Sequence, residues 1–173
     1  RFVHFGILQL YNKRTPIVFS LNDFSDDFKN PEDTITGRKH WYGAFYYNII
    51  LKKSLFGKKY YLFGWDLNNG RTYKKVLDVL KVKNSGLVFG SKDFIMSKKK
   101  IKTRHILEYK YDAVVHLNYD PNLDKVKVLG GDVQAFLQAK FLKQKLKLSK
   151  PRLYLNTVES DIEAERAARG EGF

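Results

Sequence analysis

The side chains most capable of chemistry are spread singly along this sequence. It contains no cysteine, which excludes thiolate catalysis, disulfides and cysteine-bound metals. The four histidines, His4, His40, His105 and His116, lack the spacing that aims two imidazoles at one ion, and the serines occur in no G-x-S-x-G pattern. We therefore expect no catalytic residue, no metal site and no cofactor.

Carboxylates are concentrated in one loop, NDFSDDFKNPED. This loop has enough oxygen atoms for calcium, but it lacks the ligand periodicity and central glycine of an EF-hand, so helix caps and Asx turns explain it more simply. In the predicted strands the only carboxylates are Asp66, Asp78 and Glu108, and their positions in the alternating strand patterns do not indicate that any two face each other. Glycoside hydrolysis needs two carboxyl groups that do. We do not expect an enzyme. The residues of the acidic loop that could supply oxygen ligands to calcium are Asn22, Asp23, Asp26, Asp27, Asn30, Glu32 and Asp33.

Positive charge dominates the composition. The formal net charge is +14, and most of the excess lies in residues 41–156. Such a charge attracts nucleic acid, anionic lipid or acidic proteins. The run SKKKIKTR, residues 97–104, has no RNA-recognition motif beside it, so a solvated surface or an acidic protein partner is favoured over nucleic acid. The candidate partner-binding residues are Lys98, Lys99, Lys100, Lys102, Arg104, Lys140, Lys143, Lys147 and Arg152.

The stretch GWDLNN is either a ligand-binding loop or the corner of a hairpin. Asn68, Asn69 and the following glycine accept left-handed backbone conformations, and Asp66 can bond backbone N–H groups two residues on. Trp65 can anchor the end of its strand. These residues therefore predict a hairpin corner over 67–71, and a binding role for Trp65, Asp66, Asn68 and Asn69 stays open.

Short apolar runs separated by turn residues must position these groups. Two strands joined at residues 12–15 are expected first, then the acidic loop, and then an antiparallel meander, which gives a mainly β fold of about eight to ten strands. The stretch YGAFYYNIIL is apolar on both faces, which predicts a central strand. The expected strands of the meander are 42–51, 58–66, 72–83, 86–90, 104–111, 113–119 and 124–129.

The pattern changes after residue 130. Residues 1–130 are expected to form the β domain, and residues 131–173 an interaction arm made of a basic helix, a linker held by Pro151 and a short acidic helix. A strand through DVQAF is the alternative for the start of this arm. The longest apolar runs are about ten residues, too short for a membrane-spanning helix.

Several motifs in order resemble a family of exported Bacteroidota proteins. They are LNDF, the acidic loop ending in NPED, WYGAFYYNII, GWDLNN and HILEYKYD, and they lie in residues 17–128. The resemblance implies a signal peptide, a periplasmic location at the inner face of the outer membrane and no established enzymatic activity. It extends to the PorD-like accessory component of the type IX secretion machinery. The chain departs from the family after Val128, where LGGDVQAF follows at once, without the further Pro- and Tyr-rich segment that precedes the last strand of the family.

Together these features predict a non-enzymatic periplasmic subunit that binds other proteins of an envelope assembly, associated with type IX secretion or gliding. A nucleic-acid-binding β domain with a Lys-rich, aromatic-interleaved surface is the alternative. A carbohydrate-binding domain that uses Trp41, Trp65 and Asp66 is the third hypothesis.

Overall fold

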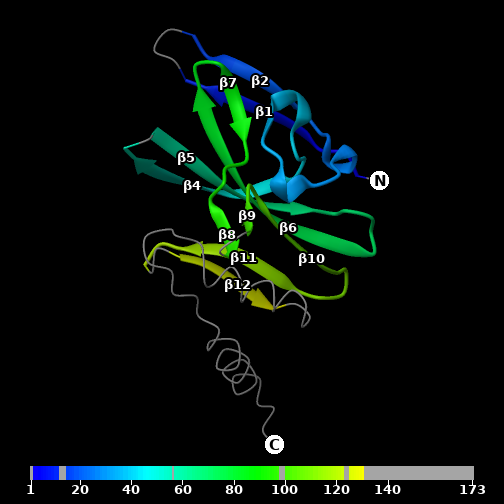
Figure 1. Ribbon diagram of the computed structural model, residues 1–173. Helices are drawn as coiled ribbons and strands as arrows, with labels where there is room; N and C mark the ends of the chain where they lie inside the picture. Colours follow the sequence, from blue (N-terminus) through cyan, green and yellow to red (C-terminus); the bar gives the residue numbers. More distant parts are fainter. Residues whose placement is uncertain (1, 12–14, 56, 98–99, 123–124, 131–173) are drawn as a thin grey trace, which may run out of the picture.

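A computed structural model describes residues 2–11, 15–55, 57–97, 100–122 and 125–130, and it confirms a mainly β, antiparallel fold (Figure 1). The predicted arm, residues 131–173, lies outside the described residues. Within the described ranges, no helix is long and apolar enough to cross a membrane. The strands are β1 (Phe5–Leu10), β2 (Ile17–Asn22), β3 (Thr36–Gly37), β4 (Phe45–Ser54), β5 (Gly57–Asp66), β6 (Thr72–Lys83), β7 (Gly86–Phe89), β8 (Phe94–Ser97), β9 (Lys100–Lys102), β10 (His105–Lys110), β11 (Val115–Asp120) and β12 (Lys125–Gly130).

The main sheet is built around β6, the longest strand. One edge of β6 pairs with β5, and the other pairs with β7 near its end and with β10 near its start. The order along the sheet is β3-β7-β6-β5-β4, and three hairpins, β1-β2, β8-β9 and β11-β12, stand outside it. Every pairing between these strands is antiparallel, as the turn-rich sequence predicts.

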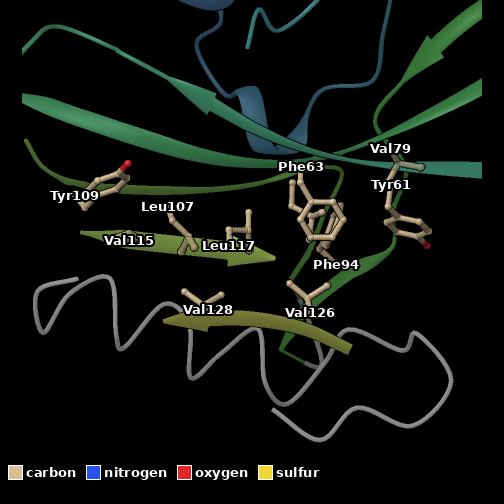
Figure 2. Packing of buried hydrophobic residues seen from close by; sticks show 11 residues of the cluster. Tyr61, Phe63, Val79, Phe94, Leu107, Tyr109, Val115, Leu117, Val126 and Val128 are labelled. Atoms are coloured by element: carbon tan, nitrogen blue, oxygen red, sulfur yellow. The ribbon is translucent and has the colours of Figure 1, made fainter. Parts of the chain in front are cut away.

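One face of the main sheet packs on the β11-β12 hairpin. Alternate residues of β5, β6 and β10 point to this side and meet Val115, Leu117, Val126 and Val128 (Figure 2). The polar residue between the two buried residues of β11, His116, is exposed, as its alternating sequence predicts. This cluster is the larger part of the core, and its members in the main sheet and β8 are Tyr61, Phe63, Leu77, Val79, Phe94, Leu107 and Tyr109.

The opposite face packs on the N-terminal part of the chain. Trp41, which follows the short 3-10 turn Arg38–His40, is 2% exposed and lies among Leu62, Leu80 and Phe89. Leu21 of β2 joins the same cluster, so the β1-β2 hairpin covers one part of this face. The acidic loop, with 3-10 turns at Ser25–Asp27 and Pro31–Asp33, lies over another part of it.

The structure corrects the expectation that YGAFYYNIIL forms a central strand. Strand β4 is the last strand of the sheet and pairs only with β5 among the described residues. Three of its side chains, Phe45, Ile49 and Leu51, are 65%, 59% and 41% exposed. An apolar residue on both faces is typical of a covered strand, but here the second cover is missing from the described part of the chain.

Sequence reasoning also missed the β8-β9 hairpin. Its second strand contains Lys100 and Lys102 of the lysine run, which we interpreted only as a charged surface. Phe94, at the start of β8, is 1% exposed in the core, while β9 pairs back on β8 and leads directly to Arg104. The hairpin therefore anchors the lysine run to the fold at both ends.

Candidate functional site

The GWDLNN stretch is a hairpin corner whose polar atoms are engaged within the protein. Asn68 has a φ of 48° and Gly70 a φ of 77°, which are the left-handed conformations that these residue types accept. Asp66 Oδ1 accepts the backbone N–H of Asn68 at 2.8 Å, and Asn69 Oδ1 accepts those of Arg71 and Thr72. The predicted corner over 67–71 is confirmed.

Trp65 lies apart from the other two residues of the carbohydrate hypothesis. Its ring packs edge-on against Tyr73, 5.6 Å between centroids, on the face that carries the β11-β12 hairpin. Trp41 is buried on the opposite face, and Asp66 is only 5% exposed, with Oδ2 3.3 Å from the hydroxyl of Tyr42. The structure therefore brings no sugar-binding platform together from Trp41, Trp65 and Asp66.

An aromatic cage around one lysine does form beside Trp65. The Lys75 ammonium lies 5.0 Å from the ring centre of Tyr47 and 5.7 Å from that of Trp65. Burial lowers the pKa of Lys75, and the electron-rich ring faces partly replace the lost water. Tyr47 in turn donates its hydroxyl to the backbone oxygen of Leu117 at 2.6 Å. The cage thus joins β4, β5 and β6 to the β11-β12 hairpin.

The structure corrects the placement of Arg104 among surface cations. Its side chain and that of Asp78 are both 0% exposed, and its Nε donates to Asp78 Oδ2 at 2.9 Å. The guanidinium also donates to the backbone oxygen of Pro31 and lies 5.5 Å from the ring centre of Tyr42. Burial raises the pKa of Asp78, and the charge of Arg104 opposes that rise. Arg104 is a core residue that fastens the acidic loop to β6.

Lys102 is engaged in the same region. It forms an ion pair with Glu32 of the acidic loop. His105 Nδ1 lies 3.4 Å from Glu32 Oε1 without an aligned hydrogen bond, and burial lowers the pKa of His105, which disfavours the charged form of its ring. Burial favours a higher pKa for Glu32, but its contacts with His105 and Lys102 outweigh burial and lower that pKa to about 2. The opposite charges of Lys102 and Glu32 therefore neutralise each other and contribute little electrostatic attraction to a partner.

A cleft of about 570 Å³ opens between the acidic loop and strands β6, β9 and β10. Its wall mixes Glu32 and Glu108 with Lys74, Lys100 and Lys102. Glu108 Oε1 accepts the Thr72 hydroxyl at 2.6 Å, so it is tied to the hairpin corner. Among the described residues, no three His, Asp or Glu side chains form a group that could hold a metal ion.

The acidic loop uses its first carboxylate structurally. Asp23 Oδ2 accepts the backbone N–H of His4 at 2.8 Å, and Oδ1 accepts those of Ser25 at 2.9 Å and Gly43 at 3.2 Å. Burial opposes ionisation of Asp23, but the bonds from His4 and Ser25 prevail and hold its pKa far below the ordinary value. An Asx turn thus accounts for Asp23, as the sequence predicts.

The predicted partner-binding lysines are only partly placed by the structure. Lys100 is exposed and lines the cleft, Lys102 is paired, and Arg104 is buried. The structure therefore does not bring these three together as one basic patch. Lys98, Lys99, Lys140, Lys143, Lys147 and Arg152 lie outside the described residues.

The most accessible feature that sequence reasoning missed is the outer edge of β4. Its exposed side chains, Phe45, Ile49 and Leu51, are followed by lysines at the end of the β4-β5 hairpin. The sequence signal for this exposed edge was an apolar strand followed by paired lysines on both sides of a turn, but we interpreted the strand as covered on both faces.

Comparisons with protein-family models, with curated proteins and with solved structures find no match for this chain.

Proposed function

We propose that this protein is a non-enzymatic interaction subunit of a Bacteroidota envelope assembly, associated with type IX protein secretion or gliding and placed in the periplasm at the inner face of the outer membrane. The location and the assembly rest on the family resemblance of the motifs in residues 17–128. The interaction role rests on one structural observation, the free outer edge of β4 in the described part of the chain.

A long edge strand with a mostly uncharged sequence is unusual in a folded protein. Natural sheets shield such edges with short strands, charges or proline, since unpaired N–H and C=O groups recruit other strands. Strand β4 is ten residues long, and its first seven residues, FYYNIIL, carry no charge and no proline. At the other end of the sheet, β3 has only two residues. The β3 end of the sheet is therefore short, whereas the edge formed by β4 is longer and mostly apolar, with a bulge between Tyr46 and Asn48.

The geometry of β4 fits the addition of a strand from a partner. An extended segment beside β4 would satisfy its outward backbone groups, and apolar side chains of that segment could cover Ile49 and Leu51, which share one face. We propose that the partner supplies an extended segment with alternating apolar residues. The contact requires no catalytic group.

The experiment is site-specific photo-crosslinking in cells that produce the tagged full chain. A photoreactive residue at position 49 should yield crosslinks to envelope proteins, identified by mass spectrometry after gentle detergent extraction. The matched control is position 114, because Val114 is 66% exposed and Ile49 59% exposed. Ile49→Asp should abolish co-purification, whereas Val114→Asp should leave it unchanged.

Two outcomes would overturn the proposal. Equal crosslinking from positions 49 and 114 would show that β4 has no specific partner. Loss of co-purification on deletion of residues 132–173, with no effect of Ile49→Asp, would place the contact in the arm and remove β4 from it.

A further inference from the structure

The end of the β4-β5 hairpin concentrates like charges that the fold alone does not require. Lys52 lies directly opposite Lys59, and Lys53 directly opposite Lys58. Like charges at opposing positions of an antiparallel pair destabilise it. Two consecutive pairs of this kind are therefore costly to the hairpin unless an anion outside it compensates.

The two pairs differ in how their charge is used. Lys59 binds Asp93 at 2.6 Å, and Lys52 donates to the hydroxyl of Tyr119 at 3.1 Å. Lys53 and Lys58 are exposed on the other face, and within the described ranges neither forms an ion pair. Both are therefore exposed cations without an anionic partner among the described residues, and an external anion would find them accessible there.

A third strand adds to this positive region. The pKa of Lys81 is lowered by burial and then by the nearby charge of Lys59, with a further contribution from Lys83. The carboxylate of Asp93 acts in the opposite direction, but it also binds Lys59 and the Tyr61 hydroxyl. Cations from β4, β5 and β6 therefore gather at this end of the sheet.

The turn between the lysines is apolar. Leu55 is 100% exposed, and the sequence continues with Phe56, whose placement is outside the described residues. Gly57 completes the turn with a φ of 111°, a conformation that requires glycine. The hairpin end extends to the left of the sheet in Figure 1, and Lys52, which precedes the turn, contacts Tyr119 of β11. A leucine at a fully exposed tip, with exposed lysines before and after it, is the opposite of an ordinary solvated turn.

We propose that this hairpin end, defined by Lys53, Leu55 and Lys58, docks on an anionic lipid surface. Leu55 enters the boundary between head groups and acyl chains, while Lys53 and Lys58 contact lipid phosphates. Stable attachment of a peripheral protein generally needs two signals, an apolar insertion and an electrostatic attraction, and the hairpin supplies both. Nucleic acid fits less well, because a polyphosphate would engage the lysines but gives the leucine at the tip no apolar contact.

This inference is independent of the proposed strand addition at β4. The hairpin end can bind a membrane whether or not the outer edge of β4 takes a protein segment. A purified system without any partner protein therefore separates the two proposals.

The test is co-sedimentation of the purified full chain with vesicles. Vesicles of phosphatidylcholine mixed with phosphatidylglycerol should bind the protein, and vesicles of phosphatidylcholine alone should bind it much more weakly. Lys53→Glu with Lys58→Glu should reduce binding to the mixed vesicles roughly tenfold or more, since each lysine near an anionic surface contributes substantially. Leu55→Asp should reduce binding even in high salt, where the electrostatic attraction is screened.

The matched control keeps the same change in net charge away from the hairpin. Lys29→Glu with Lys39→Glu alters two exposed lysines of the acidic loop region and should reduce binding far less than the hairpin variant. If both double variants lost vesicle binding equally, the loss would be explained by net charge alone, and the proposal would be overturned. It would also be overturned by equal binding to neutral vesicles, or by tip-dependent binding to single-stranded DNA without binding to vesicles. Urea unfolding of each variant verifies that the fold is retained.

Discussion

Removing the guanidinium of Arg104 should expose how much the buried ion pair constrains the fold. In Arg104→Met, the Asp78 carboxylate would remain fully buried without the cation that lies 2.9 Å from it. The backbone oxygens of Pro31 and Thr34 would also lose a donor, at 3.4 Å in the case of Thr34. Methionine fills much of the space of arginine, so the loss is chiefly electrostatic.

The expected magnitude is large. Breaking a buried ion pair by removing one partner costs about 3–5 kcal/mol. The free energy of unfolding of a natural domain is about 5–15 kcal/mol, so this variant should lose a substantial part of it. Urea unfolding followed by tryptophan fluorescence measures the loss, and Trp41, buried against one face of the sheet near Phe89, is a suitable probe.

A second substitution distinguishes the ion pair from a simple packing defect. Asp78→Asn added to Arg104→Met removes the uncompensated charge while it keeps an acceptor for the backbone N–H of Val79, which Asp78 Oδ1 accepts at 2.7 Å. The double variant should therefore be more stable than Arg104→Met by at least about 1 kcal/mol. If the double variant were the less stable of the two, an uncompensated charge on Asp78 could not be the cause.

The same variant has a distinct pH dependence. Burial already raises the pKa of Asp78 in the native fold, and without Arg104 only the backbone hydrogen bonds from Val79 and Gly90 oppose it, so this pKa rises further. In the pH range between the Asp78 pKa of the native fold and the higher one of the variant, only the folded variant holds this proton. The deficit of Arg104→Met should therefore grow as the pH rises through that range and shrink in acid. A deficit that is constant with pH would refute the reasoning.

Two further substitutions test the acidic loop. Glu32→Gln should cost up to roughly 3 kcal/mol at pH 7, because the folded pKa of Glu32 is about 2 against an ordinary 4.5. The loss of unfolding free energy should be complete above pH 4.5 and disappear as the pH falls toward 2. Thermal unfolding between pH 7 and pH 3 measures this loss. The control Asp112→Asn, at an exposed site, should show no such dependence of stability on pH. Gly43→Ala would place Cβ within 2.2–2.5 Å of the Asp23 carboxylate atoms and should destabilise the fold by about 1–3 kcal/mol in urea, whereas Gly37→Ala, whose nearest contact is 3.6 Å, should not. Equal effects at both glycines would contradict the close approach.

Local sequence chemistry predicted the β5-β6 hairpin well. The expected strands 58–66 and 72–83 correspond to β5 (Gly57–Asp66) and β6 (Thr72–Lys83), with the corner between them as expected. Turn residues act within a few positions of themselves, and alternation along a strand is a local property. These features therefore need no knowledge of the distant chain.

The errors concern contacts between distant segments. In the sequence, Arg104 is the last cation of a run that we interpreted as a surface. Its burial depends on contacts with distant residues, such as the ion pair with Asp78, 26 residues earlier. Strand β4 has apolar residues on both faces, a pattern shared by a covered strand and by a strand that awaits a partner. Periodicity reports which faces are apolar but not what lies against them.

The total charge of +14 is a poor guide to where this protein attracts anions. Lys102 and Arg104 are neutralised inside the fold by Glu32 and Asp78, so most of the described end of the lysine run adds little to the outward field. Lys53 and Lys58 stand opposite each other on an exposed hairpin end. Field strength at a surface depends on unpaired charges that lie close together, since salt screens separations beyond about 10 Å. Reversal of two lysines at the hairpin end should therefore weaken binding to anions more than the same reversal elsewhere, although the net charge changes equally.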